Sequence, residues 1–391
     1  MGGGRMRTAL ALTLVISGGL LAGCGGGGAG KAQPSDSSPS ATPAASGAKA
    51  ACTPGPMEDR ASAVLVVGLP GVTESSDPVV TQVLQAKVGG VLITEPNVRS
   101  SAQVGQLVSD IRARAGRPLI VATGEESGRV STFRSLFGRS PSARVLAGRS
   151  ATAVQAVAHD VGSKLAAVGV NLDLAPVLDL DAGPAGSLIG DRSFSADPAR
   201  AGAYGLAWAR GLAAAKVVPT AKHFPGHGRA TGDSHLELPR VDTPLAELQQ
   251  SDLQPFADLI KAGVPAVMLD HVAYAAFDAD LPASLSPAAY KLLRDMGFRG
   301  VAITDSVGMG AVNLRWGFGE AAVRAIAAGA DGVLTTDGTQ APMMRDAIVA
   351  AVRQGRIPEA RLNEAAGRVT ALAGGQARAL TCTAPELPTL G

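Results

Sequence analysis

Short apolar runs recur eight times along the chain, and each is followed by a longer segment whose apolar residues have helical spacing. Eightfold alternation of strand and helix is the pattern of a (β/α)8, or TIM, barrel. An open, doubly wound sheet is the structural alternative, but eight units and a long connection after the fifth run favour closure. We therefore expect an α/β fold in the form of a TIM (β/α)8 barrel. The predicted strands are 63–68, 90–94, 119–123, 170–175, 217–221, 266–269, 301–304 and 332–335.

Alanine-rich segments between these runs are predicted to be helices. Three helical segments begin where a polar residue precedes proline, at Asp197-Pro198, Thr243-Pro244 and Ser286-Pro287. Such residues cap a helix N-terminus and fix the backbone of its first turn. The predicted helices include 151–168, 199–215, 245–262 and 319–328.

Polar residues gather where the predicted strands end. In a TIM barrel the C-terminal ends of the strands meet at one face, and that face carries the active site. Four of the five histidines fall in the segments after the fifth and sixth runs. The barrel therefore predicts one site built from these positions. They are Glu125, Glu126, Asp173, Asp179, Lys222, His223, His227, His235, Asp270, His271 and Asp305.

The most informative stretch is Ala-Lys-His-Phe-Pro-Gly-His-Gly at 221–228, followed by Asp-Ser-His at 233–235. Its Pro-Gly step excludes a helix, so His223 and His227 lack the geometry of a helical metalloprotease site. An aspartate two residues before a histidine orients the imidazole and raises its basicity. Taken alone, the same residues also fit a turn aspartate and a solvated loop histidine.

This stretch resembles the signature loop of glycoside hydrolase family 3, in particular the single-barrel bacterial β-N-acetylglucosaminidases of peptidoglycan turnover. Further segments resemble the family in the same order, between about residues 60 and 375. The resemblance implies a barrel that hydrolyses glycosidic bonds. The further segments are Ala-Pro-Val-Leu-Asp at 175–179, Ile-Gly-Asp-Arg-Ser-Phe at 189–194, Pro-Ala-Ser-Leu-Ser at 282–286 and Ala-Gly-Ala-Asp at 328–331.

The resemblance implies a role for each matching residue. His235 is expected to be the general acid/base, with Asp233 as its partner. The family's Ser-Asp-Asp-Leu-Ser-Met segment aligns with 304–309, which puts the nucleophile at Asp305. A carboxylate that ends an apolar strand fits this role, because it is costly there without a partner or a function. Substrate-binding roles are implied for Lys222, His223, Arg192, Glu126, Arg129 and Met309.

One departure from the family concerns the sugar pocket. After its third strand the family carries Asp-Gln-Glu-Gly-Gly-Arg-Val, whereas residues 124–130 read Gly-Glu-Glu-Ser-Gly-Arg-Val. The aspartate that binds sugar hydroxyls is thus replaced by Gly124. Loss of a buried hydrogen-bond acceptor costs about 1–3 kcal/mol. Either Glu125 reaches in to replace it, or the preference for the terminal sugar differs.

Three other positions depart from the family pattern. Ser306 stands where the family often has a second aspartate, and Gly308 where it often has serine. Asp270 stands where the family has a small residue. Its carboxylate is open to two interpretations, a hydrogen bond to Lys222 or a sugar hydroxyl, and an ion pair with an arginine.

The expected activity is that of a retaining exo-β-N-acetylglucosaminidase, a β-N-acetylhexosaminidase that acts on cell-wall fragments with GlcNAc-MurNAc units. It would proceed through a covalent glycosyl-Asp305 intermediate, with His235 in place of the second carboxyl that most such enzymes use. A phosphorylase is one alternative, because a neutral histidine does not repel phosphate. A catalytically silent sugar-binding lipoprotein is another.

A metal-dependent barrel hydrolase is disfavoured, because the His-x-His pair expected at the first strand is absent. We therefore expect neither a metal nor a cofactor. A net charge of +2, no basic run and 3% aromatic residues leave no platform for nucleic acid. The expected partners are an oligosaccharide substrate and, through a lipid anchor, the membrane. The protein is expected to be a monomer.

The N-terminus has the pattern of a lipoprotein signal. Arg5 and Arg7 precede an apolar run at 9–21 that is too short to span a membrane. The Leu-Ala-Gly-Cys that follows resembles a bacterial lipobox with Cys24 as the lipidated residue; an ordinary cleavage site is the alternative. We expect export and anchoring at the outer face of the cell membrane. The expected organisation is a signal peptide (1–23), a lipidated cysteine with a Gly/Ala/Ser/Pro tether (24–55), the catalytic barrel (56–376) and a tail (377–391).

Two cysteines remain after Cys24, and they flank the predicted barrel. Cys52 precedes the first strand and Cys382 follows the last helix. In an exported protein the compartment permits disulfides, so we expect these two to pair; two free thiols are the alternative. On the loop-entropy model such a bridge contributes up to about 5 kcal/mol.

Overall fold

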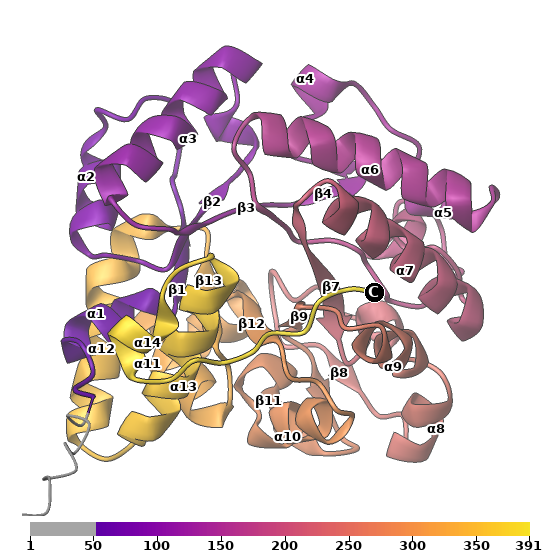
Figure 1. Cartoon of the computed structure of the whole chain (residues 1–391). Helices are drawn as coiled ribbons and strands as arrows, with labels where there is room; N and C mark the ends of the chain where they lie inside the picture. Colours follow the sequence, from indigo (N-terminus) through magenta and orange to yellow (C-terminus); the bar gives the residue numbers. More distant parts are fainter. Residues whose placement is uncertain (1–51) are drawn as a thin grey trace, which may run out of the picture. The chain divides into compact units, whose positions relative to one another are not determined.

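Eight parallel strands close into a barrel in the computed structural model, which describes residues 52–391 (Figure 1). Around the barrel the order is β1-β13-β12-β9-β7-β6-β3-β2. Each barrel strand therefore pairs with the barrel strands that precede and follow it along the chain, and the last pairs with the first. The predicted TIM barrel is confirmed, and the open sheet is wrong. The barrel strands are β1 (Leu65–Gly68), β2 (Gly90–Ile93), β3 (Ile120–Thr123), β6 (Leu172–Asp173), β7 (Val218–Phe224), β9 (Ala266–Leu269), β12 (Val301–Ser306) and β13 (Gly332–Thr335).

Two barrel strands extend further than the apolar pattern indicated. β7 continues through Lys222 and His223 to Phe224, which pairs with Leu269 of β9. β12 likewise includes Asp305. The pattern ended both strands early because polar side chains interrupt the apolar run, although the backbone keeps its pairing with the neighbouring strand. Residues expected in loops therefore sit on the barrel itself.

Helices lie outside the barrel strands (Figure 1). Asp197 caps α7 as predicted, since its side chain accepts a hydrogen bond from the backbone N–H of Arg200. No helix among residues 52–391 is both long and apolar enough to cross a bilayer. The longer helices are α2 (Pro78–Gln85), α3 (Ser101–Ala115), α6 (Ala151–Ala167), α7 (Pro198–Ala214), α9 (Gln254–Lys261), α10 (Pro287–Asp295), α11 (Gly310–Ala328), α12 (Ala341–Arg353) and α13 (Glu359–Leu372).

The predicted helix 245–262 is two helices in the structure. α8 (Leu245–Gln250) ends before Ser251, and α9 begins at Gln254. Pro255 explains the break, because proline has no N–H group to donate to the preceding turn and its ring clashes there. The prediction of one continuous helix was wrong at this point.

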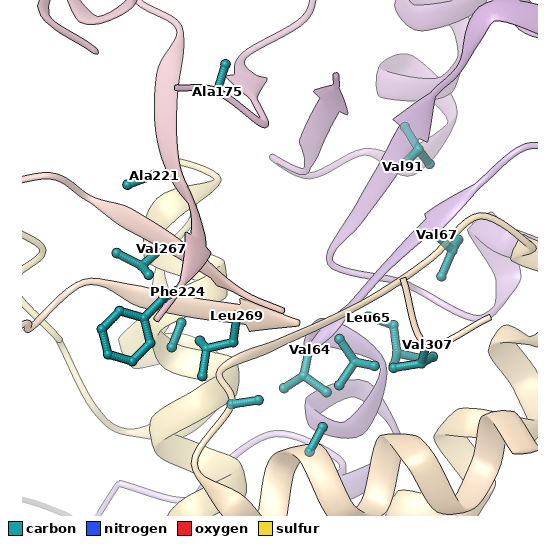
Figure 2. Close-up of a cluster of buried hydrophobic side chains, with 14 of the residues drawn as sticks. Val64, Leu65, Val67, Val91, Ala175, Ala221, Phe224, Val267, Leu269 and Val307 are labelled. Atoms are coloured by element: carbon teal, nitrogen blue, oxygen red, sulfur yellow. The ribbon is translucent and has the colours of Figure 1, made fainter. Parts of the chain in front are cut away.

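Alternate residues along each strand face opposite sides of the barrel wall. On β1, Val66 belongs to the apolar cluster inside the barrel, whereas Leu65 and Val67 belong to the cluster between strands and helices. Figure 2 shows labelled members of this outer cluster. The alternation recurs around the barrel. The inner cluster contains Val66, Leu92, Ile120, Ala122, Leu172, Leu174, Met268, Val301, Ile303, Leu334 and Val369.

The N-terminal end of the barrel is covered by the last part of the chain. Val369 of α13 joins the inner cluster, and Leu387 of the tail packs against it. A disulfide joins Cys52 to Cys382, which follows α14 (Ala377–Thr381). The predicted pairing is confirmed. The bridge links residues 330 apart in sequence, so it ties the two ends of the barrel segment together.

One buried carboxylate joins β12 to two helices. Asp331 is fully buried and accepts hydrogen bonds from Arg294 of α10 and from Arg361 and Arg368 of α13. The backbone N–H of Ala302 on β12 also donates to it, at 3.0 Å. Burial raises the pKa of Asp331, but the three arginines outweigh burial and hold its pKa below the usual range.

Asp331→Asn is expected to lower the free energy of unfolding at pH 7 by about 3–5 kcal/mol, because three partly buried arginines lose their fully buried counter-charge. The folded-state pKa lies below the unfolded value of about 3.9, so this stabilisation is present above that pH and is lost as pH falls through the folded-state pKa. The deficit of the variant should therefore shrink in strong acid. Urea unfolding at pH 7 and pH 3 measures it.

Asp346→Asn is the matched control. Asp346 pairs only with the adjacent Arg345 on the surface, so its loss should change unfolding by less than about 1 kcal/mol. An equal deficit for Asp331→Asn at both pH values would contradict an electrostatic origin.

Candidate active site

The C-terminal ends of the barrel strands surround two adjoining cavities. One, of about 150 Å³, is lined by Arg192, Lys222 and His223; we call it the cationic cavity. The other, of about 440 Å³, is bounded by apolar and hydroxyl side chains; we call it the uncharged cavity. The residues that line both cavities are Leu174, His235, Asp305 and Met309. Those that bound only the uncharged cavity include Leu92, Thr94, Gly124, Thr132, Leu334 and Thr336.

Asp305 lies near the end of β12, where a β-bulge disturbs pairing with β13. Its Oδ1 accepts a hydrogen bond from the Ser306 N–H group at 2.7 Å. Burial raises the pKa of Asp305, but the positive fields of His223 and Lys222 and the Ser306 N–H group outweigh it, so the pKa lies below its usual value. Asp305 is therefore a carboxylate at neutral pH.

Glu126 of β4 (Glu125–Ser127) binds two cations of the cationic cavity. Arg192 donates from Nε and Nη2 to the two carboxylate oxygens, each at 2.7 Å, and Lys222 Nζ lies 2.5 Å from Oε1. Burial raises the pKa of Glu126, but the two cations outweigh burial and hold the pKa well below the usual range. Glu126 does not line either cavity itself. It fixes the positions of Arg192 and Lys222.

Asp179 plays the same part for the histidines. Its Oδ2 lies 2.6 Å from His223 Nδ1, and its Oδ1 accepts hydrogen bonds from the backbone N–H groups of His223 and His227. Burial raises the pKa of Asp179, but His223 outweighs it and the pKa is lowered. An ionised carboxylate only accepts, so His223 Nδ1 carries the hydrogen and Nε2 is left for a ligand.

His235 pairs with Asp233 as the Asp-x-His spacing predicted. Asp233 Oδ1 lies 2.8 Å from His235 Nδ1 and accepts the His235 backbone N–H at 2.9 Å. These two hydrogen bonds lower the pKa of Asp233. The carboxylate therefore fixes a proton on Nδ1 and leaves Nε2 for proton exchange. The imidazole side chain is 62% exposed, so bulk water and a bound ligand both have access to it.

The Asp-Ser-His loop is attached to the start of α11. Gly310 N donates to the carbonyl of His235 at 3.0 Å, and Ala311 N donates to that of Ser234 at 3.1 Å. The first N–H groups of a helix have no acceptor within the helix, and the loop supplies two. A Cβ at position 310 would lie 2.5 Å from the His235 oxygen, so this close approach requires glycine.

His271 supports the strand end that carries Asp305. Its Nε2 donates to the carbonyl of Ser306 at 2.9 Å, and its Nδ1 lies 2.6 Å from Ser284 Oγ. Burial lowers the pKa of His271, which favours the neutral ring. A neutral ring that donates from Nε2 accepts the Ser284 hydroxyl at Nδ1. The Pro-Ala-Ser-Leu-Ser segment thus contributes Ser284 to the support of the site.

Asp270 has a different partner from the two considered in the sequence. Its Oδ2 accepts a hydrogen bond from Tyr274 Oη at 2.6 Å, and its Oδ1 accepts the Val272 N–H. The side chain is fully buried, and burial raises its pKa. Neither a bond to Lys222 nor a pair with an arginine forms. The tyrosine four residues further on was the signal for this partner.

Arg129, an expected substrate-binding residue, lines neither cavity. Its Nε donates to Asp191 at 2.9 Å, and its Nη2 donates to the carbonyls of Leu188 and Ile189 at 3.0 Å. These acceptors belong to the segment that leads into Arg192. Arg129 therefore positions the Arg192 segment. Met309, also an expected substrate-binding residue, lines both cavities.

Glu125 does not take the place of the missing aspartate. Its Oε2 accepts a hydrogen bond from the Phe133 N–H group at 2.9 Å, away from both cavities. Burial raises the pKa of Glu125. The interpretation that Glu125 reaches into the pocket is wrong. Position 124 is open, because a Cβ built there meets no atom within 4 Å.

The sequence did not predict the hydroxyl side chains that line the uncharged cavity. Thr94 and Thr336 follow β2 and β13, and Thr132 lies in the connection after β3. Strand alternation was the available signal, since Thr94 and Thr336 keep the inward phase of Leu92 and Leu334. Among residues 52–391, no three His, Cys, Asp or Glu side chains form a group that could hold a metal ion.

Comparison with known proteins places this geometry in a family. The model of the glycosyl hydrolase family 3 N terminal domain matches residues 61–372. Beta-hexosaminidase LpqI of Mycobacterium tuberculosis is 37% identical over 326 residues, which cover 81% of this chain and 82% of the relative.

Solved structures give the same result. The structure titled M tuberculosis LpqI aligns with a TM-score of 0.77 and 36% identity over 83% of this chain and 98% of that one. A glycoside hydrolase family 3 beta-N-acetylglucosaminidase from Paenibacillus sp. aligns with a TM-score of 0.76 and 34% identity over 83% of this chain and 62% of that one. With the barrel and the carboxylate and histidine pair at its mouth, these matches assign the chain to glycosyl hydrolase family 3.

Proposed function

We propose that this protein is a retaining exo-β-N-acetylglucosaminidase that acts on peptidoglycan-derived fragments. The observation that carries the proposal is that a carboxylate, Asp305, and a carboxylate-supported histidine, His235, line the same two cavities. Retaining hydrolysis needs one group to attack the anomeric carbon and another to protonate the leaving oxygen. The two side chains provide these functions.

Asp305 is the nucleophile in this mechanism. Its lowered pKa keeps it ionised, which the attack on the anomeric carbon requires. The hydrogen bond from Ser306 occupies Oδ1, so Oδ2 is the oxygen available for the new bond. The glycosyl–Asp305 ester forms as the bond to the leaving oxygen breaks, and water then hydrolyses the ester.

His235 is the acid in the first step and the base in the second. Asp233 holds a proton on Nδ1 and stabilises the imidazolium, so Nε2 delivers a proton to the leaving oxygen. Nε2 later takes a proton from the attacking water. Most retaining enzymes use a second carboxylic acid for these steps, and the Asp233–His235 pair replaces it.

Arg192, Lys222 and His223 bind sugar hydroxyls in the cationic cavity. All three are held by buried carboxylates before any ligand enters, which lowers the ordering cost of binding. Glu126, Asp179 and Arg129 act through them as positioning residues. The names of the relatives, beta-hexosaminidase and beta-N-acetylglucosaminidase, support an N-acetylhexosamine as the terminal sugar.

We further propose that the protein is exported and anchored by lipid at Cys24. Residues 1–24 carry the signal, and they lie outside the residues that the structure describes. The Cys52–Cys382 disulfide supports this location, since such bonds persist in oxidising compartments outside the cytosol. In this arrangement the monomeric enzyme meets wall fragments at the outer face of the membrane.

Asp305→Ala is expected to lower kcat/KM for aryl β-N-acetylglucosaminide by on the order of 10³-fold or more, because no glycosyl–enzyme can form. Asp346→Ala, an exposed aspartate, is the control. Assays in Tris and in phosphate identify the product. Free N-acetylglucosamine in both buffers fits hydrolysis, whereas sugar 1-phosphate in phosphate buffer would replace the hydrolase with the phosphorylase alternative.

Asp233→Asn is expected to slow the release of poor leaving groups by about 10²–10⁴-fold, because an amide does not stabilise the imidazolium. Activated leaving groups such as dinitrophenol need little proton donation, so their release should fall much less. A series of aryl glycosides of graded leaving-group acidity measures the difference. Asp242→Asn, an exposed change in the same connection, should leave the series unaltered. A uniform loss across the series would count against acid catalysis.

Cys24→Ser is expected to release the protein from the membrane fraction of the host, since the thiol that carries the lipid is lost. Fractionation with intact-mass measurement tests this. A variant that stays in the membrane fraction, with a mass that differs from the wild-type mass only by the cysteine-to-serine change, would exclude lipidation at Cys24.

A further inference from the structure

Two inward-facing positions at the mouth of the barrel are glycines, Gly68 on β1 and Gly124 after β3. A Cβ at Gly68 would collide with the backbone of Thr336, so only Gly124 leaves open space. On β2 and β13, inward Leu92 and Leu334 are followed two residues later by Thr94 and Thr336, which line the uncharged cavity. On β3, inward Ile120 and Ala122 are followed by Gly124. A Cβ at Gly124 meets no atom within 4 Å, so the space above it is open. At the corresponding position β2 and β13 are followed by threonine side chains, whereas Gly124 leaves the space empty.

The room above Gly124 is part of a cavity that adjoins the catalytic pair. The uncharged cavity holds about 440 Å³ and includes Asp305 and His235 in its wall. Apart from these two, its lining has no titratable side chain. Hydroxyl and aliphatic side chains make up the rest, and the hydroxyls are those of Thr94, Thr132, Ser306 and Thr336. Such a surface suits an uncharged, hydroxyl-bearing ligand. Apart from His235, an anionic substituent would find no cationic side chain there, in contrast to the cationic cavity.

The depth of the cavity decides which part of a substrate enters it. The leaving group must lie beside His235, whose side chain is 62% exposed on the outer loop. The floor of the uncharged cavity is formed by Leu92, Leu174 and Leu334, which belong to the cluster inside the barrel. A group that contacts these leucines therefore lies deeper than the exposed His235, and we expect it to be attached to the sugar bonded by Asp305 and not to the departing group.

We propose that the uncharged cavity is a binding site for a further neutral sugar carried on a hydroxyl of the terminal residue, and that Gly124 creates it. This inference rests on the proposed function. The enzyme then releases a disaccharide as well as a single sugar. The same bond breaks: the glycosyl unit passes to Asp305 and then to water, and His235 gives its proton to the leaving oxygen.

The test compares two substrates of the full-length enzyme. One is aryl β-N-acetylglucosaminide, and the other is the aryl β-glycoside of the GlcNAc-GlcNAc disaccharide. The wild-type enzyme is expected to release the aryl group from both, with intact disaccharide found by mass spectrometry in the first minutes. Release of a monosaccharide before any aryl group from the second substrate would overturn the inference.

Variants at Gly124 test the cause. Gly124→Asp and Gly124→Leu fill the cavity with and without an acceptor, and Gly124→Ala is the matched control with one methyl group. The ratio of kcat/KM for the disaccharide substrate to that for the monosaccharide substrate should fall at least about tenfold in the first two and less than about twofold in the control. An unchanged ratio in both large variants would overturn the role of Gly124.

The two proposals fail in different ways. If the wild-type enzyme turns over neither substrate, the proposed glycosidase function is wrong. If it turns over only the monosaccharide substrate, the glycosidase function stands and the additional sugar site is wrong. Asp305→Ala should abolish both activities, which confirms that they share one reaction centre.

Discussion

Closure of eight parallel strands into a barrel is the constraint on which the site depends. Closure sends every second side chain of each strand toward the axis. Deep in the barrel these inward positions are apolar and form the inner core, with Ile303 and Leu334 among them. Nearer the C-terminal ends of the strands, the next inward-facing positions border a cavity. Threonines, Lys222 and Gly124 occupy them. The inner core and the site are therefore two successive layers of inward-facing residues on the same strands.

The buried cationic side chains of this layer are each paired with a buried carboxylate. Glu126 holds Arg192 and Lys222, and Asp179 holds His223, so each of these three side chains has a carboxylate at hydrogen-bond distance. Burial alone would neutralise these groups, and pairing keeps the carboxylates ionised. The surrounding positive charge then lowers the pKa of Asp305 as well. The groups that we propose to bind sugar hydroxyls thus also keep Asp305, the proposed nucleophile, ionised.

The mouth of the barrel is divided into two chemically different halves. Strands β6 and β7 with their connections supply the donors of the cationic cavity, while β2, β3 and β13 supply a neutral wall. Asp305 on β12 lies between the halves, and the loop with His235 reaches both. Binding specificity on the neutral side depends on shape and hydroxyl contacts, so removal of one side chain at Gly124 has a large effect on what fits there.

Sequence alone determined the barrel and its eight strands, because apolar periodicity carries that information. The Asp233–His235 pair is local in the chain, and Cys52 with Cys382 were the two cysteines left to pair. Resemblance to a family predicted roles for Arg192, Lys222 and Asp305, and the structure brings all three to one cavity. Arg129, expected to bind substrate, bonds to the Arg192 segment instead. Glu125, one of two alternatives for the missing acceptor, bonds to Phe133.

Tertiary structure decided the partners. Glu126 bonds to Arg192, 66 positions along the chain, and Asp179 bonds to His223, 44 positions along the chain. Asp270 bonds to Tyr274 and to no residue that lines a cavity. No periodicity encodes such contacts, because they depend on which side chains closure brings to the same height of the barrel. The open space at Gly124 has the same origin. A missing side chain in a sequence becomes a cavity only when the residues around it are known in three dimensions.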